Sequence, residues 1–304
     1  MIYTVTLNPS IDFTVHVQTL RRGELNRMDQ EQKYPGGKGI NVSRILARIG
    51  VETTALGFVG GFTGTYLTKA LTSEGVAHDF VRIDGDTRIN IKLKEQSGET
   101  EINGAGPSIP PDRLQQFLQK LERLRAGDML VLAGTIPPSL PPDLYQTLLV
   151  TYGKRGIKVV VDTSGEALAQ VIRHHPFLIK PNHHELGELF NTTFTSLDET
   201  IPYGEKLLAQ GIRHVIVSMA DKGALLFTAD GIYRSNVPRG TVVNSVGAGD
   251  SLVAGFIGHL SQHGSVPDAF RYGIATGGAT AFSADLASLD TIETVYPQVQ
   301  LTKL

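Results

Sequence analysis

A chain of 304 residues, of which 41% are hydrophobic and 19% charged, can bury the core of one large α/β domain or of two smaller ones. The formal net charge of −2 offers no broad positive surface, so we expect neither nucleic acid nor an anionic membrane as a partner. The absence of cysteine excludes disulfides, thiolate nucleophiles and thiolate zinc sites. The sequence has no apolar run of about 18 residues, the length of a membrane span. It also has no basic region of a signal peptide at its N-terminus, so we expect a cytoplasmic protein.

The N-terminal quarter of the chain predicts buried strands and helices with more exposed strands between them. Ile2–Leu7 is apolar enough for a buried strand, which Asn8 and Pro9 end. Apolar residues recur at intervals of three and four between Val42 and Ile49, which predicts a helix that ends at Gly50. The other elements predicted here are half-exposed strands at Asp12–Val17 and Met28–Tyr34, a strand at Thr53–Val59 and a helix at Thr63–Glu74.

A second pair of exposed strands is predicted near residue 95. Arg88–Glu95 alternates apolar and polar residues, so Ile89 would be covered while Asn90 would face water. Glu99–Asn103 would return antiparallel through a turn at Ser97-Gly98. Such half-solvated strands do not fit a buried sheet. We therefore expect a small separate β layer, a lid, formed by the segments around 12–34 and 88–103.

The second half of the chain alternates strands with amphipathic helices. The strands are predicted at 128–133, 157–161, 177–179 and 214–218, and the helices at 143–154, 166–173, 183–190 and 197–210. An antiparallel pair at 224–227 and 232–237 precedes a strand that ends at Val243, and the last helix is Pro267–Phe282. Apolar strands that alternate with amphipathic helices indicate a mostly parallel sheet covered on both faces. We expect one α/β domain over residues 1–304.

The stretch Thr241–Leu260 places glycines where a helix begins. Gly247, Ala248 and Gly249 precede Asp250 and an apolar helical face. The first N–H groups of a helix lack internal partners, and glycines let a phosphate oxygen approach them. Asp250 fits two roles here: it can favour the helix start electrostatically, or it can act as a general base toward a hydroxyl that attacks the bound phosphate.

Polar clusters follow several of the predicted strands. Ligands of open α/β sheets bind beyond the carboxyl ends of the strands, although turn residues and helix caps also gather there. Lys180, Asn182 and Glu185 offer a cation, an amide and a carboxylate, which suit a nucleotide and magnesium. The other clusters are Asn8 with Asp12, Asp162-Thr163-Ser164 and the segment from Ser218 to Asp221.

Three basic residues, Arg27, Lys38 and Arg88, lie in or beside the lid. They would form a second anion site, for a phosphorylated substrate, or else an ordinary solvated face. Neither a P-loop, nor a dinucleotide fingerprint, nor the protein-kinase motifs occur in the chain. The adjacent histidine pairs at 174–175 and 183–184 do not have the spacing of a metal site.

The chain resembles the PfkB family of ribokinase-like sugar kinases over essentially its whole length. Pro35–Asn41 resembles the first family signature and Asn244–Phe256 the second. With Asn8–Asp12 and Thr87–Asn90, these motifs are similar to those of the phosphosugar branch, which includes bacterial fructose-1-phosphate and tagatose-6-phosphate kinases. Asn244-Ser245 departs from the Asp-Thr of the wider family. The resemblance implies a three-layer α/β/α fold and a homodimer formed through the lid.

The resemblance also implies roles for individual residues. Asp250 would be the catalytic base, with Gly247, Ala248 and Gly249 as the anion hole. The sugar phosphate would contact Asp12, Gly37, Lys38, Asn41, Arg88 and Asn90. Mg²⁺ would be bound by Glu185. ATP would be bound by Lys180, Asn182, Ser218, Ala220, Asp221 and Gly223. In the last loop, Met219-Ala220 replaces a usual glycine.

The implied reaction is ATP- and magnesium-dependent phosphorylation of a ketohexose monophosphate, with fructose 1-phosphate to fructose 1,6-bisphosphate favoured. The nearest alternative is a tagatose-6-phosphate kinase. A non-catalytic sugar-phosphate sensor is disfavoured, because a sensor needs no base. A nucleotide-dependent oxidoreductase is disfavoured by the missing glycine fingerprint.

Overall fold

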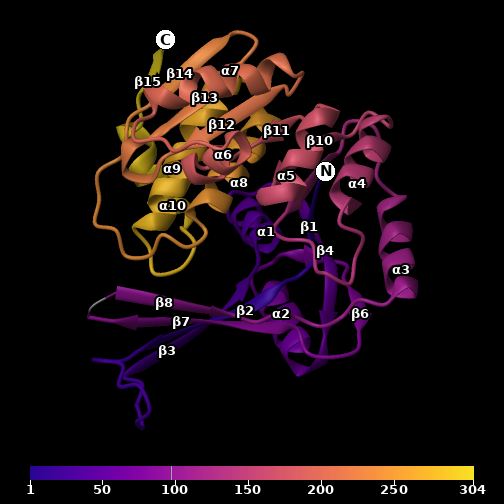
Figure 1. The fold of residues 1–304 in the computed structure, drawn as a ribbon, viewed down its shortest axis with the longest axis vertical. Coiled ribbons are helices and arrows are strands. Elements are labelled where there is room, and N and C mark those ends of the chain that lie inside the picture. The colour runs from indigo at the N-terminus through magenta and orange to yellow at the C-terminus, as the bar shows by residue number, and fades with distance from the viewer. Residues whose placement is uncertain (97) are drawn as a thin grey trace.

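The computed structural model describes residues 1–96 and 98–304, which form a large sheet with helices on both faces and a smaller sheet that projects from it (Figure 1). The large sheet has the strand order β15-β14-β13-β12-β11-β10-β9-β1-β4-β5, and β6 also pairs with β4. Its strands are β1 (Ile2–Thr6), β4 (Thr53–Gly60), β5 (Ala77–His78), β6 (Val81–Ile83), β9 (Met129–Ala133), β10 (Lys158–Asp162), β11 (Leu178–Ile179), β12 (His214–Ser218), β13 (Ala224–Thr228), β14 (Gly231–Ser235) and β15 (Leu301–Lys303). Pairing is parallel from β12 to β5 and antiparallel from β12 to β15. The predicted mostly parallel sheet is confirmed.

Two layers of helices cover the sheet because successive side chains of a strand point to opposite faces. On β9, Leu130 packs into the core with α3, α4, α5, α6 and α7, while Val131 packs into the core with α1, α8, α9 and α10. A third cluster joins α2 to α1 and β4. The helices are α1 (Lys38–Arg48), α2 (Gly61–Ser73), α3 (Pro111–Leu121), α4 (Leu144–Gly153), α5 (Gly165–Val171), α6 (His183–Phe190), α7 (Ile201–Ala209), α8 (Ala248–His263), α9 (Val266–Ala281) and α10 (Leu289–Val295).

One predicted strand is wrong, and several elements were not predicted. Residues 241–243 belong to a loop in which Val242 is 66% and Val243 52% exposed. Their β-branched side chains favour a strand, but the place beside β14 is taken by β15 from the C-terminus. The elements that sequence analysis missed are α3, α10, β5, β6 and β15.

The lid is the four-stranded sheet β3-β2-β7-β8. Its strands are β2 (Ser10–His16), β3 (Gln30–Gly36), β7 (Arg88–Glu95) and β8 (Gly98–Asn103). β2 lies at the centre, where Asp12 pairs with Tyr34 on one side and with Asn90 on the other. The predicted lid segments are therefore one sheet. The predicted turn at Ser97-Gly98 involves Ser97, which lies outside the described residues.

The two faces of the lid are covered differently. Asn90 and Lys92, expected on a wet face, are only 9% and 6% exposed, whereas Ile89 is 41% and Ile102 56% exposed. The polar face lines a cleft on the main body, and the apolar face is the outer one. Alternation identifies two faces, but it does not tell which of them is covered.

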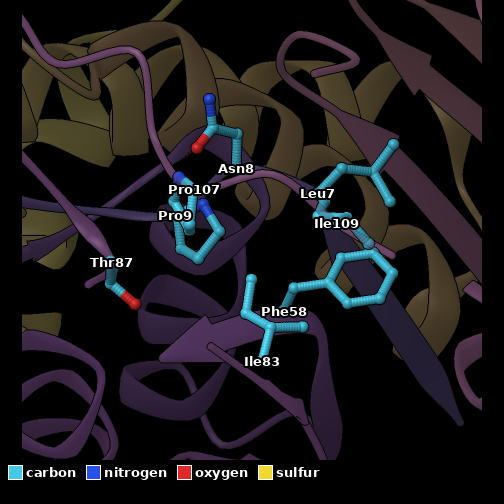
Figure 2. A pocket seen from close by; sticks show the side chains of 8 residues that line it. All are labelled: Leu7, Asn8, Pro9, Phe58, Ile83, Thr87, Pro107 and Ile109. Atoms are coloured by element: carbon cyan, nitrogen blue, oxygen red, sulfur yellow. The ribbon is translucent and has the colours of Figure 1, made fainter. Parts of the chain in front are cut away.

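The connection from β1 to the lid packs closely on the main body. Figure 2 shows Asn8, Pro9, Phe58, Ile83 and Pro107 among the residues that line a pocket. The cavity between them has a volume of about 10 Å³. That volume holds about one water molecule, so the base of the lid has little free space beneath it. Among the described residues, no helix has both the length and the apolar character that a membrane crossing requires.

Candidate active site

A cleft of about 470 Å³ separates the inner face of the lid from the carboxyl ends of the central strands. The starts of α1, α6 and α8 border it, because helices that follow parallel strands begin at this edge. The cleft brings together twelve of the residues predicted from the sequence, namely Asp12, Gly37, Lys38, Asn41, Arg88, Asn90, Lys180, Asn182, Glu185, Gly247, Gly249 and Asp250. Sequence reasoning did not assign the lining residues Thr6, Ser10, Lys92, Glu101 and Asn103.

The first turn of α8 is open toward this cleft. Gly247 occupies the N-cap position with φ 76°, and no side chain caps the helix. A Cβ on Gly247 would lie 2.6 Å from Leu286 Cδ2, and one on Gly249 would lie 3.3 Å from Lys180 Nζ. The glycines therefore allow close packing at the helix start, and the helix dipole favours an anion there.

Asp250 lies in the same turn and is 7% exposed. Asn41 Nδ2 donates a hydrogen bond of 2.8 Å to its Oδ2. Burial raises the pKa of Asp250 to about 6, and the Asp162 carboxylate adds to this shift while Lys38 opposes it. A carboxylate with a pKa near neutral accepts a proton efficiently in this environment.

Asp162 is the site residue that sequence analysis placed in a cluster but did not assign. It is 1% exposed at the end of β10, where Lys38 Nζ lies 3.1 Å and Lys180 Nζ 3.5 Å from its Oδ1. Burial raises the pKa of Asp162, but Lys180 and Lys38 outweigh burial and hold it below its usual value. Asp162 in turn raises the pKa of Lys38, although burial opposes this. The only feature of the sequence that pointed to Asp162 as a site residue was its position directly after a buried strand.

Asn182 and Glu185 form the capping box of α6. The Asn182 side chain accepts hydrogen bonds from the backbone of His184 and Glu185, and Glu185 Oε2 accepts one of 2.8 Å from Asn182 N. The helix-cap role considered for them is confirmed. Glu185 Oε1 lies 3.9 Å from Lys38 Nζ, so this oxygen faces the same charged cluster.

The inner face of the lid presents Asp12 to the cleft. Ser10 Oγ and Asn90 Nδ2 donate to Asp12 Oδ1 at 2.8 and 3.2 Å, and Lys92 Nζ lies 3.9 Å from Oδ2. A Cβ on Gly36 would lie 2.5 Å from the Asp12 carboxyl carbon, so the carboxylate requires glycine there. Both of these hydrogen bonds go to Asp12 Oδ1, and Asp12 itself lines the cleft.

The guanidinium of Arg88 donates hydrogen bonds to two backbone carbonyl oxygens from distant parts of the chain. Its Nε donates to Asn8 O at 3.2 Å and its Nη1 to Gly104 O at 3.1 Å, and burial lowers its pKa. Lys38, which pairs with Asp162, lines the same cleft as Arg88, whereas Arg27 lies in the exposed loop between β2 and β3. The structure therefore brings two of the three predicted basic residues to the cleft.

The family model described as pfkB family carbohydrate kinase matches residues 5–292. The chain belongs to the pfkB family. It is 53% identical over 304 residues to the 1-phosphofructokinase of Bacillus subtilis (strain 168), with 100% of both chains covered. It is 36% identical to the D-tagatose-1-phosphate kinase of Bacillus licheniformis, again over 100% of both chains. The structure of Escherichia coli phosphofructokinase-2 in complex with substrates and products superposes with a TM-score of 0.93 at 30% identity, covering 97% of this chain and 98% of that one. The expected ribokinase-like fold is confirmed, and the protein is an ATP-dependent sugar-phosphate kinase.

In this pfkB kinase, the predicted nucleotide loop follows β12. Ala220 takes φ 42° and Gly223 φ 91°, so alanine adopts the left-handed backbone for which glycine is usual. A backbone bridge between Asn182 and Ser218 places this loop beside the start of α6. Ser218, Ala220, Asp221 and Gly223 thus lie next to the cleft rather than among its lining residues.

Magnesium needs only one or two protein carboxylates when substrate phosphates and waters complete its shell. Within residues 1–96 and 98–304, no three acidic or histidine side chains gather into a ready metal cage. Asp162 Oδ2 is buried and has no hydrogen-bond partner, and Glu185 Oε1 lies near the same lysine. These two carboxylates fit an ion that arrives with ATP.

Proposed function

We propose that this kinase transfers the γ-phosphoryl group of ATP to the primary hydroxyl of a ketohexose monophosphate, with fructose 1-phosphate as the preferred substrate. The observation that carries this proposal is the buried Asp250 carboxylate, held by Asn41 beside an uncapped helix start. The choice of sugar phosphate is supported by the name of the B. subtilis relative. The product would be fructose 1,6-bisphosphate.

The chemistry follows from the open start of α8. The C6 hydroxyl of the sugar donates its proton to Asp250 as its oxygen bonds to the γ-phosphorus, and the bond to the β-phosphate oxygen breaks to release ADP. The N–H groups of the turn formed by Gly247, Ala248 and Gly249 stabilise the negative charge that spreads over the transferring oxygens. The Lys180 and Lys38 ammonium groups, already beside Asp162, offset the same charge.

ATP would lie between the nucleotide loop and α8, contacting Lys180, Asn182, Ser218, Ala220, Asp221 and Gly223. Mg²⁺, held by Glu185 with help from Asp162, would neutralise phosphate charge when it is bound. The Asn182–Ser218 bridge supports a common site for the two segments.

The sugar would lie against the lid. Asp12 Oδ2, which lies 3.9 Å from Lys92 Nζ, would accept from a sugar hydroxyl, since Ser10 and Asn90 already donate to Oδ1. Gly37, Lys38 and Asn41 would complete this side at the start of α1. Arg88 has donors beyond the two used by backbone carbonyls, and these would meet the existing phosphate. Arg27 stays a predicted contact of that phosphate.

A second candidate substrate is a tagatose phosphate. The B. licheniformis relative is named D-tagatose-1-phosphate kinase, and tagatose differs from fructose at one stereocentre. A tagatose 6-phosphate substrate, considered from the sequence, would place the existing phosphate at the other end of the sugar. Initial rates with ATP and each of fructose 1-phosphate, tagatose 1-phosphate, tagatose 6-phosphate and fructose rank these candidates by kcat/KM.

The lid also supports a homodimer. Its outer face exposes Ile89 and Ile102, and a second copy of this face is the partner we propose.

The cytoplasmic location of the protein stays a prediction.

The decisive test of the proposed reaction is Asp250→Asn compared with Asp268→Asn. Both aspartates lie in the first turn of a 16-residue helix, so both substitutions remove the same helix-start electrostatics. General-base loss should lower kcat by roughly 10²–10⁴-fold in Asp250→Asn alone. Equal activity of the two variants would reduce Asp250 to a helix-start residue and overturn the proposal.

A further inference from the structure

An ion network around the buried Arg44 lies beside the cleft and takes no part in the chemistry described so far. Arg44 is 2% exposed. Its Nε donates to Glu74 at 2.8 Å, and its Nη1 and Nη2 donate to the two oxygens of Asp285 at 3.1 and 2.5 Å. Arg48 Nη2 donates to the same two carboxylates at 3.2 and 3.0 Å. The charges of two cations and two anions balance here, but burying the Arg44 guanidinium costs desolvation free energy that ion pairing often does not recover.

The network also binds the backbone of segment 285–287, an irregular stretch that follows α9. Arg48 Nη1 donates to the carbonyl oxygens of Leu286 and Ala287, the latter at 3.2 Å. Ala287 N donates to Thr280 Oγ1 at 3.1 Å, and that hydroxyl donates to Ser251 Oγ in the first turn of α8 at 2.8 Å. The segment 285–287 is therefore tied to α1 on one side and to α8 on the other.

The side chain of Leu286 connects segment 285–287 to the first turn of α8. Its Cδ2 would be 2.6 Å from a Cβ on Gly247, so the side chain packs directly on the N-cap residue of α8. Asn244, just before this turn, donates its Nδ2 to Ala284 O at 3.1 Å. A displacement of segment 285–287 would therefore displace the N–H groups that follow Gly247.

One face of α1 thus serves both parts of the catalytic turn. Asn41, Arg44 and Arg48 are spaced i, i+3 and i+7, so they share that face. Asn41 holds the carboxylate of Asp250, while the two arginines hold the segment behind Gly247. A base and an anion hole are effective only when both are fixed within about half an ångström.

We propose that Arg44 and Arg48 are positioning residues that hold segment 285–287 against Gly247 and so set the N–H groups of α8 for phosphoryl transfer. This inference rests on the proposed role of that helix start. It predicts a loss in kcat rather than in substrate binding, because the N–H groups act most strongly on the charge of the transition state.

Arg48→Met tests the inference, with Arg155→Met as the matched control. Arg155 also donates to a carboxylate, Glu122, and to two carbonyl oxygens, of Glu122 and Leu124, but it lies outside the cleft. Arg48→Met should lower kcat by at least about tenfold, since a misplacement of 1 Å costs about 10²-fold. The KM values for fructose 1-phosphate and ATP should change by less than about twofold. Arg155→Met should lower Tm about as much as Arg48→Met does, but its kcat should stay at the wild-type value.

Two further measurements separate positioning from loss of fold. Hydrogen exchange of the peptide over residues 243–252 should accelerate in Arg48→Met and not in Arg155→Met. Arg48→Lys should recover only part of kcat, because an ammonium lacks the planar fork. If Arg48→Met does not fold, Asp285→Asn removes the ion pairs that Asp285 forms with Arg44 and Arg48, with little change of volume, and should also lower kcat.

Equal kcat in Arg48→Met and Arg155→Met, with wild-type exchange over 243–252, would overturn the inference while leaving the proposed function intact. A wild-type enzyme that does not phosphorylate any ketohexose monophosphate would instead overturn the proposed function.

Discussion

Three helices begin at the cleft, and two of them, α6 and α8, have first turns that are built in opposite ways. α6 is closed by its own side chains, because Asn182 and Glu185 form a capping box. α8 begins at Gly247 with no side-chain cap. An unsatisfied helix start costs stability, and a side-chain cap is worth about 1 kcal/mol. The protein therefore leaves open the start of α8, where the proposed phosphoryl group would bind, and closes the start of α6. The start of α1, at Gly37, has no side-chain cap either.

Of the two helix starts, the open start of α8 should show the larger effect when a side chain is added to it. Gly249→Ala keeps helical geometry and gains helix propensity of about 1 kcal/mol, so the free energy of unfolding should not fall. Its Cβ would lie 3.3 Å from Lys180 Nζ, in the space over the N–H groups. We expect kcat to fall by roughly 10²-fold, as when one oxyanion donor is lost. Steady-state kinetics beside thermal unfolding check this, and unchanged kcat would show that the open turn does not bind the phosphoryl group.

A smaller effect is expected at the closed start of α6. Glu185→Gln keeps the capping box, which glutamine also forms, but it removes a carboxylate charge. The Mg²⁺ concentration for half-maximal rate should rise by about 10-fold or more, as for other losses near a metal site. A Mg²⁺ titration and a melting curve give the two readouts. A lower Tm with an unchanged titration would leave Glu185 with only its capping role.

The pH dependence tests the environment of Asp250. Its pKa is raised to about 6, and the base works only when ionised, so kcat/KM should fall by about tenfold per pH unit below pH 6. Asn41 donates to the carboxylate and so lowers its pKa. Asn41→Ala should therefore move this acid limb to higher pH. A limb that stays in place in Asn41→Ala, or that is absent from the wild type, would contradict the assignment of Asp250 as the base.

The smallest effect on turnover is expected on the outer face of the lid. Ile102 is 56% exposed there, and we expect the wild-type protein to sediment as a dimer at micromolar concentration. Ile102→Lys places a charge on this apolar face and should shift the population toward the monomer. Lys303→Glu, at the exposed C-terminal edge of the large sheet, serves as the charge-change control. A monomeric wild type would leave this apolar face without the partner that we propose.

Local signals in the sequence were sufficient for the central strands, the main helices and the two glycine-rich helix starts. A parallel strand requires continuous apolar residues, and a helix start requires particular residues within a few positions of one another. For this reason Gly247 and Asp250 could be assigned before their surroundings were known. Asn182 and Glu185 were also placed correctly at a helix start, three residues apart.

The partners of these residues were decided by tertiary structure alone. Asp162 meets Lys38 across 124 positions of sequence, and Arg44 meets Asp285 across 241. What covers each face of the lid also depends on distant segments, so the alternation separated Asn90 from Ile89 but could not show that Asn90 would be only 9% exposed. Val242 and Val243 form no strand, because a segment at the C-terminal end of the chain occupies the position beside β14. Local propensity acts over a few residues, whereas pairing and burial depend on which distant segments the fold brings together.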